Sequence, residues 1–321
     1  MTLARPLRLT LLSLLLLVGG LAAVVFSLSW QPPARQEIAA SCQAQAVTLQ
    51  PGQALKVLTW NLRALAGQPR PNEDSAAQRS ASLNAAVAVL RDEQADILLL
   101  QELHDGAAAS DYQDQLALLQ ERLGDLYPCS TQAFYWKAAF VPQQLGSVGS
   151  KLAILSRYQI LGAERLQLPR RPGNPLSRSV RPQRALLLGH LPIRGGGTLT
   201  LLNTQLDAPA EDDDSHLKQL AMTARLLDRL QADNRLWLLG GDFNTPRFDD
   251  NRQPGAGQDE LAQLAGRYPT IPDRQLAKGT RDYLLHSPSL TALDWQVRQH
   301  DTQAISDHQP VIARLLLPPL D

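Results

Sequence analysis

The sequence predicts an α/β fold, in which short buried strands alternate with helices. Apolar stretches at 55–62, 96–102 and 236–239 are too short for helices and end in polar residues or glycine, which is typical of buried strands. Segments 80–94 and 216–230 are longer and carry apolar residues at helical spacing. Alternation of the two kinds of segment indicates an α/β protein. The 321 residues correspond to about one large domain or two small ones.

Composition excludes some classes of protein and leaves others open. The 31 basic and 31 acidic residues balance, so broad electrostatic attraction for nucleic acid is not expected, although a local basic patch is compatible with this balance. Cys42 and Cys129 are the only cysteines, which is too few for a cysteine metal cluster. They could form a disulfide in an oxidising compartment, and the sequence alone leaves their pairing open.

The amino-terminal segment predicts a membrane helix. Residues 9–28 are almost entirely apolar, and about 20 apolar residues suffice to cross a bilayer. Arg5 and Arg8 precede this stretch, which favours a cytoplasmic segment at 1–8, a transmembrane anchor at 9–30 and the rest of the chain on the far side. Because the chain is rich in alanine, leucine and arginine and poor in lysine, we expect a bacterial inner membrane with the domain facing the periplasm.

A cleavable signal peptide is the alternative interpretation of the same segment. Small residues at 19–23 resemble a cleavage site, whereas the apolar run continues through 24–26, which favours a retained anchor. The next segment, 31–53, is polar and contains three prolines and a glycine. We therefore expect a linker at 31–53 and a single domain at 54–318.

Polar residues stand at the carboxyl ends of three predicted strands. Asn61 ends the first and Glu102 the second, and Asp242 and Asn244 follow the third after two glycines. Asp242 and Asn244 are two positions apart, so in an extended chain they lie on one side. The glycines permit a sharp turn and close approach of a ligand. Because ligands bind at the carboxyl ends of strands in sheets flanked by helices, we expect a polar site there.

An arginine-rich stretch is the second candidate for binding. It has no acidic residue between Arg165 and Leu206, and its arginines are Arg165, Arg170, Arg171, Arg178, Arg181, Arg184 and Arg194. Arginine suits phosphate because its fork of donors matches the phosphate oxygens. Arg184 begins a predicted strand and is the member we expect to contact substrate; a solvated basic loop is the alternative.

The last third of the chain adds further acid–base groups. Asp282 stands at the start of a short predicted strand, and Asp307 and His308 precede the closing strand at 310–317. Any one of these residues alone is more often structural than catalytic.

Taken in order, these motifs resemble those of the endonuclease/exonuclease/phosphatase superfamily, the metal-dependent phosphoesterases related to DNase I. The matching segments are Thr59-Trp60-Asn61, Leu99-Leu100-Gln101-Glu102, Ile154-Leu155-Ser156-Arg157, Gly241-Asp242-Phe243-Asn244, Asp282-Tyr283 and Ser306-Asp307-His308. They extend over nearly all of the chain beyond the predicted linker. The resemblance implies a four-layer α/β sandwich, in which two mostly antiparallel sheets pack together with helices outside.

The resemblance also implies a magnesium site. Glu102 would bind Mg²⁺, with Asn61 near it and Asp307 as a further ligand, and Mn²⁺ is a possible substitute. Hard oxygen ligands of this kind suit Mg²⁺.

Four residues would carry the catalytic chemistry by the same resemblance. Asp242 would orient or deprotonate the attacking water, and Asn244 would hold a phosphate oxygen. His308, oriented by Asp282, would contact the phosphate and help with proton transfer. A carboxylate beside an imidazole fixes its tautomer and favours its cationic form.

The expected phosphate-binding set consists of Arg184, Asn203 and Gln205. Many relatives have Asn-Thr-His-Leu where this chain has residues 203–206 with glutamine at the third position. Gln205 can donate a hydrogen bond but cannot transfer a proton. This departure argues mildly against the two-histidine mechanism of DNase I.

The function implied is Mg²⁺-dependent hydrolysis of phosphoester bonds, resembling a phosphodiesterase or nuclease, on the extracytoplasmic side of a membrane. Nucleic acid and a phospholipid headgroup are the candidate substrates. The arginine-rich stretch favours the first, and the neutral net charge with membrane tethering favours the second. A non-catalytic binding protein of the same fold is the alternative from another class, supported only by Gln205. No protein partner is implied.

Overall fold

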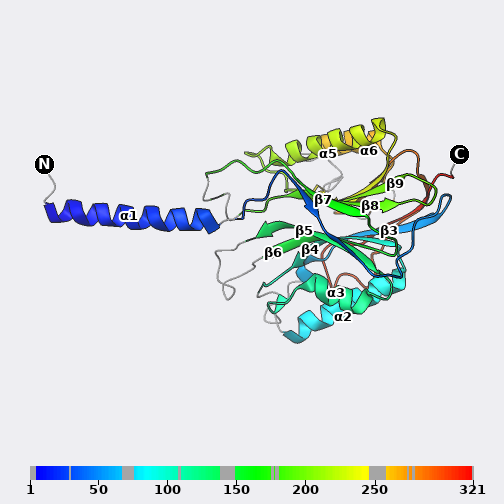
Figure 1. The fold of residues 1–321 in the computed structure, drawn as a ribbon, viewed down its shortest axis with the longest axis horizontal. Coiled ribbons are helices and arrows are strands. Elements are labelled where there is room, and N and C mark those ends of the chain that lie inside the picture. The colour runs from blue at the N-terminus through cyan, green and yellow to red at the C-terminus, as the bar shows by residue number, and fades with distance from the viewer. Residues whose placement is uncertain are drawn as a thin grey trace.

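Two β-sheets packed face to face form the centre of the molecule, and helices cover the outer face of each sheet (Figure 1). This computed structural model describes residues 5–28, 30–66, 76–107, 110–137, 149–174, 177, 181–245, 258–272, 275–276 and 279–319. Helices α5 (Ser215–Ala232) and α6 (Gln258–Arg267) cover one sheet, and α2 (Ala76–Glu93) and α3 (Gln115–Leu123) cover the other. The predicted α/β sandwich is confirmed.

The first sheet has six strands in the order β1-β7-β8-β9-β10-β11. They are β1 (Arg35–Ile38), β7 (Gly162–Gln167), β8 (Ala185–Pro192), β9 (Thr198–Gln205), β10 (Leu236–Asp242) and β11 (Asp282–His286). Strands β9 and β10 run parallel, because α5 returns the chain to the start of the sheet between them. Their carboxyl ends therefore meet at one edge, where Gln205 lies opposite Asp242.

The second sheet has seven strands in the order β12-β13-β3-β4-β6-β5-β2. They are β2 (Ala40–Cys42), β3 (Ala54–Asn61), β4 (Ile97–His104), β5 (Cys129–Lys137), β6 (Gly149–Ser156), β12 (Thr291–Val297) and β13 (Val311–Leu316). Strands β3 and β4 run parallel and are joined through α2, so Asn61 lies opposite Gln101 at their carboxyl ends. A short 3-10 helix, η1 (Arg63–Leu65), follows β3.

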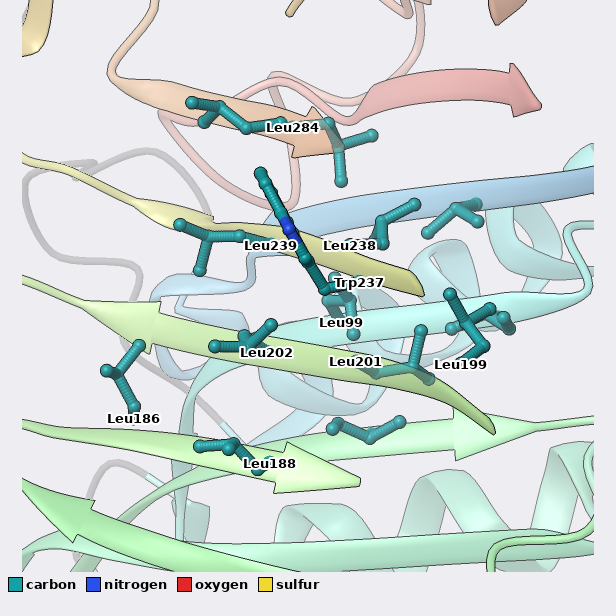
Figure 2. Packing of buried hydrophobic residues seen from close by; sticks show 14 of the residues in the cluster. Leu99, Leu186, Leu188, Leu199, Leu201, Leu202, Trp237, Leu238, Leu239 and Leu284 are labelled. Atoms are coloured by element: carbon teal, nitrogen blue, oxygen red, sulfur yellow. The ribbon is translucent and has the colours of Figure 1, made fainter. Parts of the chain in front are cut away.

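The main apolar core lies between the two sheets. Figure 2 shows leucines of β8, β9, β10 and β11 gathered around Trp237, together with Leu99 of β4 from the opposite sheet. A Cβ atom at Gly240 would lie 2.6 Å from Leu99 Cδ1 and 2.8 Å from Leu284 Cδ2. A larger residue at Gly240 would therefore have to displace the side chains of Leu99 and Leu284. A second cluster of buried apolar residues packs beneath α2 and α3.

Residues 31–53 belong to the fold, and the prediction of a linker there is wrong. The segment contains β1, which pairs with β7, and β2, which pairs with β5, so it adds an edge strand to each sheet. Cys42 of β2 also forms a disulfide with Cys129 of β5. The side chains of both strands are mostly exposed. Main-chain pairing holds these strands, and they leave no apolar pattern that would distinguish them from a linker in the sequence.

Helix α1 (Arg5–Leu28) projects from one end of the sandwich (Figure 1). In the part of the chain that the structure describes, no helix is long and apolar enough to cross a membrane, so the transmembrane anchor predicted at 9–30 is not supported. The predicted cytoplasmic segment 1–8 lies partly outside the described residues.

The chain between α1 and β1 is held against the sandwich. The Trp30 ring lies 5.1 Å from the guanidinium carbon of Arg165 and 6.5 Å from the ring of Phe134, which it meets edge-on. The main-chain N–H of Gln167 donates to the carbonyl of Ala34 at 2.9 Å. Contacts with both sheets therefore fix the point at which the chain enters the domain.

Candidate active site

The candidate catalytic residues lie at one edge of the sandwich, where the parallel pairs of both sheets end. In the first sheet, Asp242 pairs with Gln205 of β9 on one side and with Asp282 of β11 on the other, so the three residues form one row. The second sheet supplies Asn61 from the end of β3 and Glu102 from β4. The two-sheet architecture therefore brings together side chains that are far apart in the sequence.

Two amide side chains bridge two carboxylates across the seam between the sheets. Asn61 Nδ2 donates to Glu102 Oε1 and to Asp242 Oδ2, each at 3.0 Å. Gln205 Nε2 donates to the same two oxygens, at 3.2 Å in the case of Asp242. Asn61, Gln205 and Asp242 are at most 2% exposed. The four groups therefore form a buried polar network in which each amide N–H has an acceptor, as burial requires.

Glu102 reaches this network through an irregularity in β4. The pairing of β4 with β6 shifts between Leu100 and Leu103, and Glu102 has a φ of 56°. A residue with a Cβ rarely adopts this left-handed conformation, and β-bulges of this kind redirect side chains near active sites. No hydrogen bond to Glu102 Oε2 is found among the described residues, which leaves that oxygen available to a cation or to water.

The turn after β10 fixes Asp242 from the other side. The main-chain N–H of Asn244 donates to Asp242 Oδ1 at 2.8 Å, and Asn244 Nδ2 donates to the Leu206 carbonyl at 2.7 Å. Asn244 is left-handed, with a φ of 52°, which asparagine tolerates better than most residues. Gly241 has a φ of 152°, and a Cβ there would lie 2.1 Å from the Thr204 carbonyl oxygen. The second glycine of the motif is therefore required by the backbone.

Asp282 and His308 form a close pair next to Asp242. His308 Nδ1 is 2.6 Å from Asp282 Oδ2, and His308 Nε2 is 3.9 Å from Asp242 Oδ2. Burial opposes a charge on His308, but the charge and hydrogen bond of Asp282 outweigh it and raise the pKa of His308 to about 9. Burial also raises the pKa of Asp282 to about 6, against the opposing effect of His308. The pair therefore favours a charged imidazole beside a carboxylate at neutral pH.

The loop that carries His308 is tied to β3. The Ser306 hydroxyl donates to the Asn61 carbonyl at 2.8 Å and accepts the main-chain N–H of His308 at 3.1 Å. The Trp60 indole N–H donates to the His308 carbonyl at 3.0 Å. These bonds position His308 relative to Asn61, and they give a structural reason for the tryptophan and the serine in the two motifs.

Asp307 does not join the network around Glu102. Its carboxylate lies 3.3 Å from Arg281 Nη2 and 3.6 Å from Arg63 Nε, and its side chain is 40% exposed. Two arginines therefore engage the carboxylate of Asp307, which was predicted to be a metal ligand. Neither arginine was singled out in the sequence, although Arg63 follows Asn61 by two positions and Arg281 directly precedes Asp282.

Arg184 is also engaged within the protein. Its Nε donates to Asp207 Oδ1 at 3.0 Å, and its guanidinium carbon lies 5.0 Å from the centre of the Tyr135 ring. Its side chain is 13% exposed. These contacts do not support the predicted role of Arg184 in binding substrate phosphate, because its donors serve a carboxylate and its face packs on an aromatic ring. Arg178, another arginine of this stretch, lies outside the described residues.

Asn203 is buried between the sheets, and its contacts do not support the predicted role in binding phosphate. Its Nδ2 donates to the carbonyls of Leu100 and Ala153, and its Oδ1 accepts from Gln101 Nε2 at 2.7 Å. Asn203 and Gln205 point to the same face of β9 because they are two residues apart. Asn203 is one step deeper along the strand, so it braces the two sheets and does not reach the site. Gln205 in turn uses its donors on carboxylates.

The order and geometry of these residues match a known family. A model of the endonuclease/exonuclease/phosphatase family matches residues 58–308, a range that contains every residue of the site from Asn61 to His308. This chain belongs to the endonuclease/exonuclease/phosphatase family. Members of the family are hydrolytic phosphoesterases and typically depend on divalent metal ions. A comparison with curated protein sequences gives no match.

Solved structures of the family share the fold at low sequence identity. An endonuclease/exonuclease/phosphatase from Beutenbergia cavernae aligns with 21% identity and a TM-score of 0.57, over 83% of this chain and 72% of that one. The human Nocturnin catalytic domain with bound sulfate aligns with 17% identity and a TM-score of 0.56, over 87% and 97%. TDP2 from Caenorhabditis elegans aligns with 19% identity and a TM-score of 0.53, over 83% and 76%. These likenesses establish the fold.

The site residues of this family member fit a divalent cation. Ligand atoms of Asp242, Asp282 and His308 lie within 4.8 Å of one another. The charged imidazole of His308 cannot ligate a cation, but Asp282 Oδ1 is buried without a hydrogen-bond partner among the described residues and can contribute an oxygen. Glu102 adds a carboxylate whose Oε2 is available, and carboxylate oxygens are the ligands that Mg²⁺ and Mn²⁺ prefer. The donor set is thus rich in hard oxygens, in keeping with the metal dependence typical of the family.

Proposed function

We propose that this protein is a divalent-metal-dependent hydrolase of phosphoester bonds. The observation that supports it most is the bridging of Glu102 and Asp242 by the amides of Asn61 and Gln205, with His308 Nε2 3.9 Å from Asp242. Oxygen ligands, a carboxylate that can orient water and a group that can transfer a proton thereby occupy one site. Phosphoester hydrolysis requires these components held in position.

Asp242 is suited to orient and deprotonate the attacking water. Its Oδ2 accepts from Asn61 and Gln205, and its Oδ1 accepts from the main-chain N–H of Asn244, so the carboxylate is fixed before substrate binds. A carboxylate offers about four lone-pair sites, which leaves one for a water molecule. The catalytic base is therefore preorganised by three N–H donors.

His308 and Asn244 are suited to contact the phosphate. Asp282 holds Nδ1 of His308, which directs Nε2 toward the substrate side, where it can donate to a phosphate oxygen and protonate the leaving group. Asn244 uses one amide N–H on the Leu206 carbonyl and keeps a second for a phosphate oxygen.

Glu102 is the residue that we expect to hold the cation, with Mg²⁺ first and Mn²⁺ as the alternative. Asp307 could contribute only after it leaves its two arginines. The cation, when bound, would neutralise charge on the phosphate.

Hydrolysis of bis-p-nitrophenyl phosphate by the purified full-length chain tests this function. We expect turnover with Mg²⁺ or Mn²⁺, loss of turnover with EDTA, and a decrease of at least about a hundredfold for Glu102→Gln because a metal ligand is lost. Glu121→Gln, at an exposed position on α3, is the control and should keep its rate. Activity that persists in EDTA would refute the metal assignment. Absence of both turnover and cation binding would favour a non-catalytic binding protein.

Nucleic acid and a phospholipid headgroup are both proposed as substrate classes, with nucleic acid first because it is the broader class in the family. A panel of plasmid DNA, single-stranded DNA, RNA, sphingomyelin and phosphatidylinositol phosphates at one Mg²⁺ concentration separates them. Release of a headgroup with intact nucleic acids would refute the first choice. Nicking that decreases steeply with added salt would support it.

We also propose that the domain acts outside the cytoplasm, at the periplasmic side of a bacterial inner membrane. The disulfide between Cys42 and Cys129 supports an oxidising compartment, and Arg5 and Arg8 before an apolar run are typical of exported chains. A reporter at the carboxyl terminus should be active only outside the cytoplasm. Fractionation then separates a retained helix, recovered with membranes, from a cleaved signal peptide, recovered in the soluble periplasm.

A further inference from the structure

Arg281 lies directly against two residues of the site. Its Nη2 is 3.0 Å from His308 Nε2 and 3.3 Å from Asp307 Oδ2. The next residue, Asp282, holds the other nitrogen of the same imidazole at 2.6 Å. The guanidinium of Arg281 therefore covers the nitrogen of His308 that a substrate phosphate has to reach.

Arg63 approaches Asp307 through a second contact. Its Nε is 3.6 Å from Asp307 Oδ1, and its main-chain N–H donates to Asn61 Oδ1 at 2.8 Å. Arg63, Ala64 and Leu65 have φ values of 45°, 54° and 55°, a run of left-handed conformations that is unfavourable for residues with a Cβ. Backbone strain of this kind persists where the surrounding structure maintains it, which is common at functional sites. The strained turn holds Arg63 beside both Asn61 and Asp307.

Three basic side chains thus converge on one carboxylate. Arg281, Arg63 and His308 all lie within 4.0 Å of an oxygen of Asp307. Arg63 and Arg281 are each 34% exposed, and Asp307 is 40% exposed, so solutes can reach this group. An arginine fork binds phosphate oxygens at least as well as it binds a carboxylate, because both present two acceptor oxygens in one plane.

We propose that Arg281, assisted by Arg63, binds the non-bridging oxygens of the substrate phosphate in exchange for Asp307, and that this exchange uncovers His308 Nε2. The inference rests on the proposed phosphoester hydrolysis. One guanidinium cannot lie against His308 Nε2 and bind the phosphate in the same geometry, so binding of the phosphate and exposure of the imidazole are coupled. Arg281 is then a substrate-binding residue, and a purely structural ion pair with Asp307 is the alternative.

Steady-state kinetics of Arg281 variants tests the proposal in the full-length chain. With bis-p-nitrophenyl phosphate, we expect Arg281→Gln to raise KM and the inhibition constant of inorganic phosphate about tenfold or more, because it removes a charge-assisted hydrogen bond, while kcat changes less than about threefold. Arg281→Lys should be intermediate, because it keeps the charge without the fork. Arg267→Gln removes an exposed arginine paired with Asp228 at 3.1 Å and is the matched control, with unchanged constants.

Calorimetric titration with inorganic phosphate and with dimethyl phosphate gives a readout independent of turnover, with and without Mg²⁺. Arg281→Gln should weaken binding of the doubly charged phosphate more than of the singly charged diester, because the Coulomb energy scales with ligand charge. This pattern would support the proposal even if no substrate is hydrolysed. The proposal would be overturned if Arg281→Gln bound phosphate as tightly as wild type, or if wild type bound no phosphate with or without Mg²⁺. A decrease in kcat of Arg281→Gln at unchanged KM and inhibition constant would also overturn it.

Discussion

The arginine-rich stretch at 165–194 and the active site differ in the kind of polar group that the fold leaves without a partner. Arg165 is 1% exposed and donates to two main-chain carbonyls, and Arg184 is paired with a carboxylate. In the site, the acceptors Asp282 Oδ1 and Gln205 Oε1 are buried and have no hydrogen-bond partner among the described residues, whereas in the stretch the donor Arg165 Nη1 is buried without one. Most donors of Arg165 and Arg184 are therefore bound within the protein, whereas the site keeps buried acceptor oxygens that a cation or water can contact.

This difference shows that charge density in a sequence does not locate a phosphate site. The stretch with the most arginines stabilises the junction between the sheets and the entering chain, where Arg165 also lies over Trp30. The arginines beside the site, Arg63 and Arg281, are isolated in the sequence and become neighbours only through the fold. An unpaired buried polar group in a native structure requires an explanation, and a ligand supplies one here.

Asp242→Asn is expected to give the largest effect, and it tests whether the carboxylate of the site is needed for turnover. The amide cannot accept a proton from water, so kcat with bis-p-nitrophenyl phosphate should decrease at least about a hundredfold. Asp213→Asn, which changes the carboxylate paired with Arg171 at 2.8 Å, is the control and should stay within about threefold. Similar losses in the two variants would remove the distinction between the regions.

Arg165→Gln is expected to give the next largest effect, on stability and not on chemistry. Loss of the guanidinium leaves buried carbonyls without a donor, so the free energy of unfolding should decrease by about 2–3 kcal/mol. Urea denaturation measures this change, and kcat per folded molecule should stay within about twofold. A large decrease in kcat at unchanged stability would show that Arg165 acts on the reaction.

Arg184→Gln is expected to give the smallest effect. Its ion pair with Asp207 is mostly buried, but Arg171 and Gln219 also contact the Asp207 carboxylate, so we expect a loss of only about 1 kcal/mol in stability and a change in KM of less than about twofold. Thermal denaturation and initial rates measure the two quantities. A tenfold rise in KM would instead restore Arg184 as a residue that contacts phosphate.

Much of the site could be located from the sequence because its residues end continuous apolar strands. Asn61, Glu102 and Asp242 each follow such a strand, and a parallel pair of strands delivers its carboxyl ends to one edge. The two glycines before Asp242 were informative for another reason: the positive φ of Gly241 requires glycine, and Gly240 lies close to neighbouring side chains.

Other features depend on the tertiary structure and leave no local pattern. The bulge that turns Glu102 into the network arises from a register shift against β6. The depth of Asn203 in the sandwich depends on where β9 crosses the opposite sheet, since alternation gives the face of a strand and not the distance from its end. Strands β1 and β2 are exposed edge strands. They form because they pair with β7 and β5, and their amino-acid composition does not predict them.

Because Trp30 is anchored, the chain enters the domain at the end of the sheet that carries the catalytic residues. Arg35 at the start of β1 lies in one row with Leu166, Leu186, Thr204 and Gly241, and the catalytic row of Gln205, Asp242 and Asp282 comes directly after it at the same end of the sheet. Helix α1 projects from that end (Figure 1). A surface or partner that binds α1 would therefore lie at the same end of the molecule as the catalytic groups.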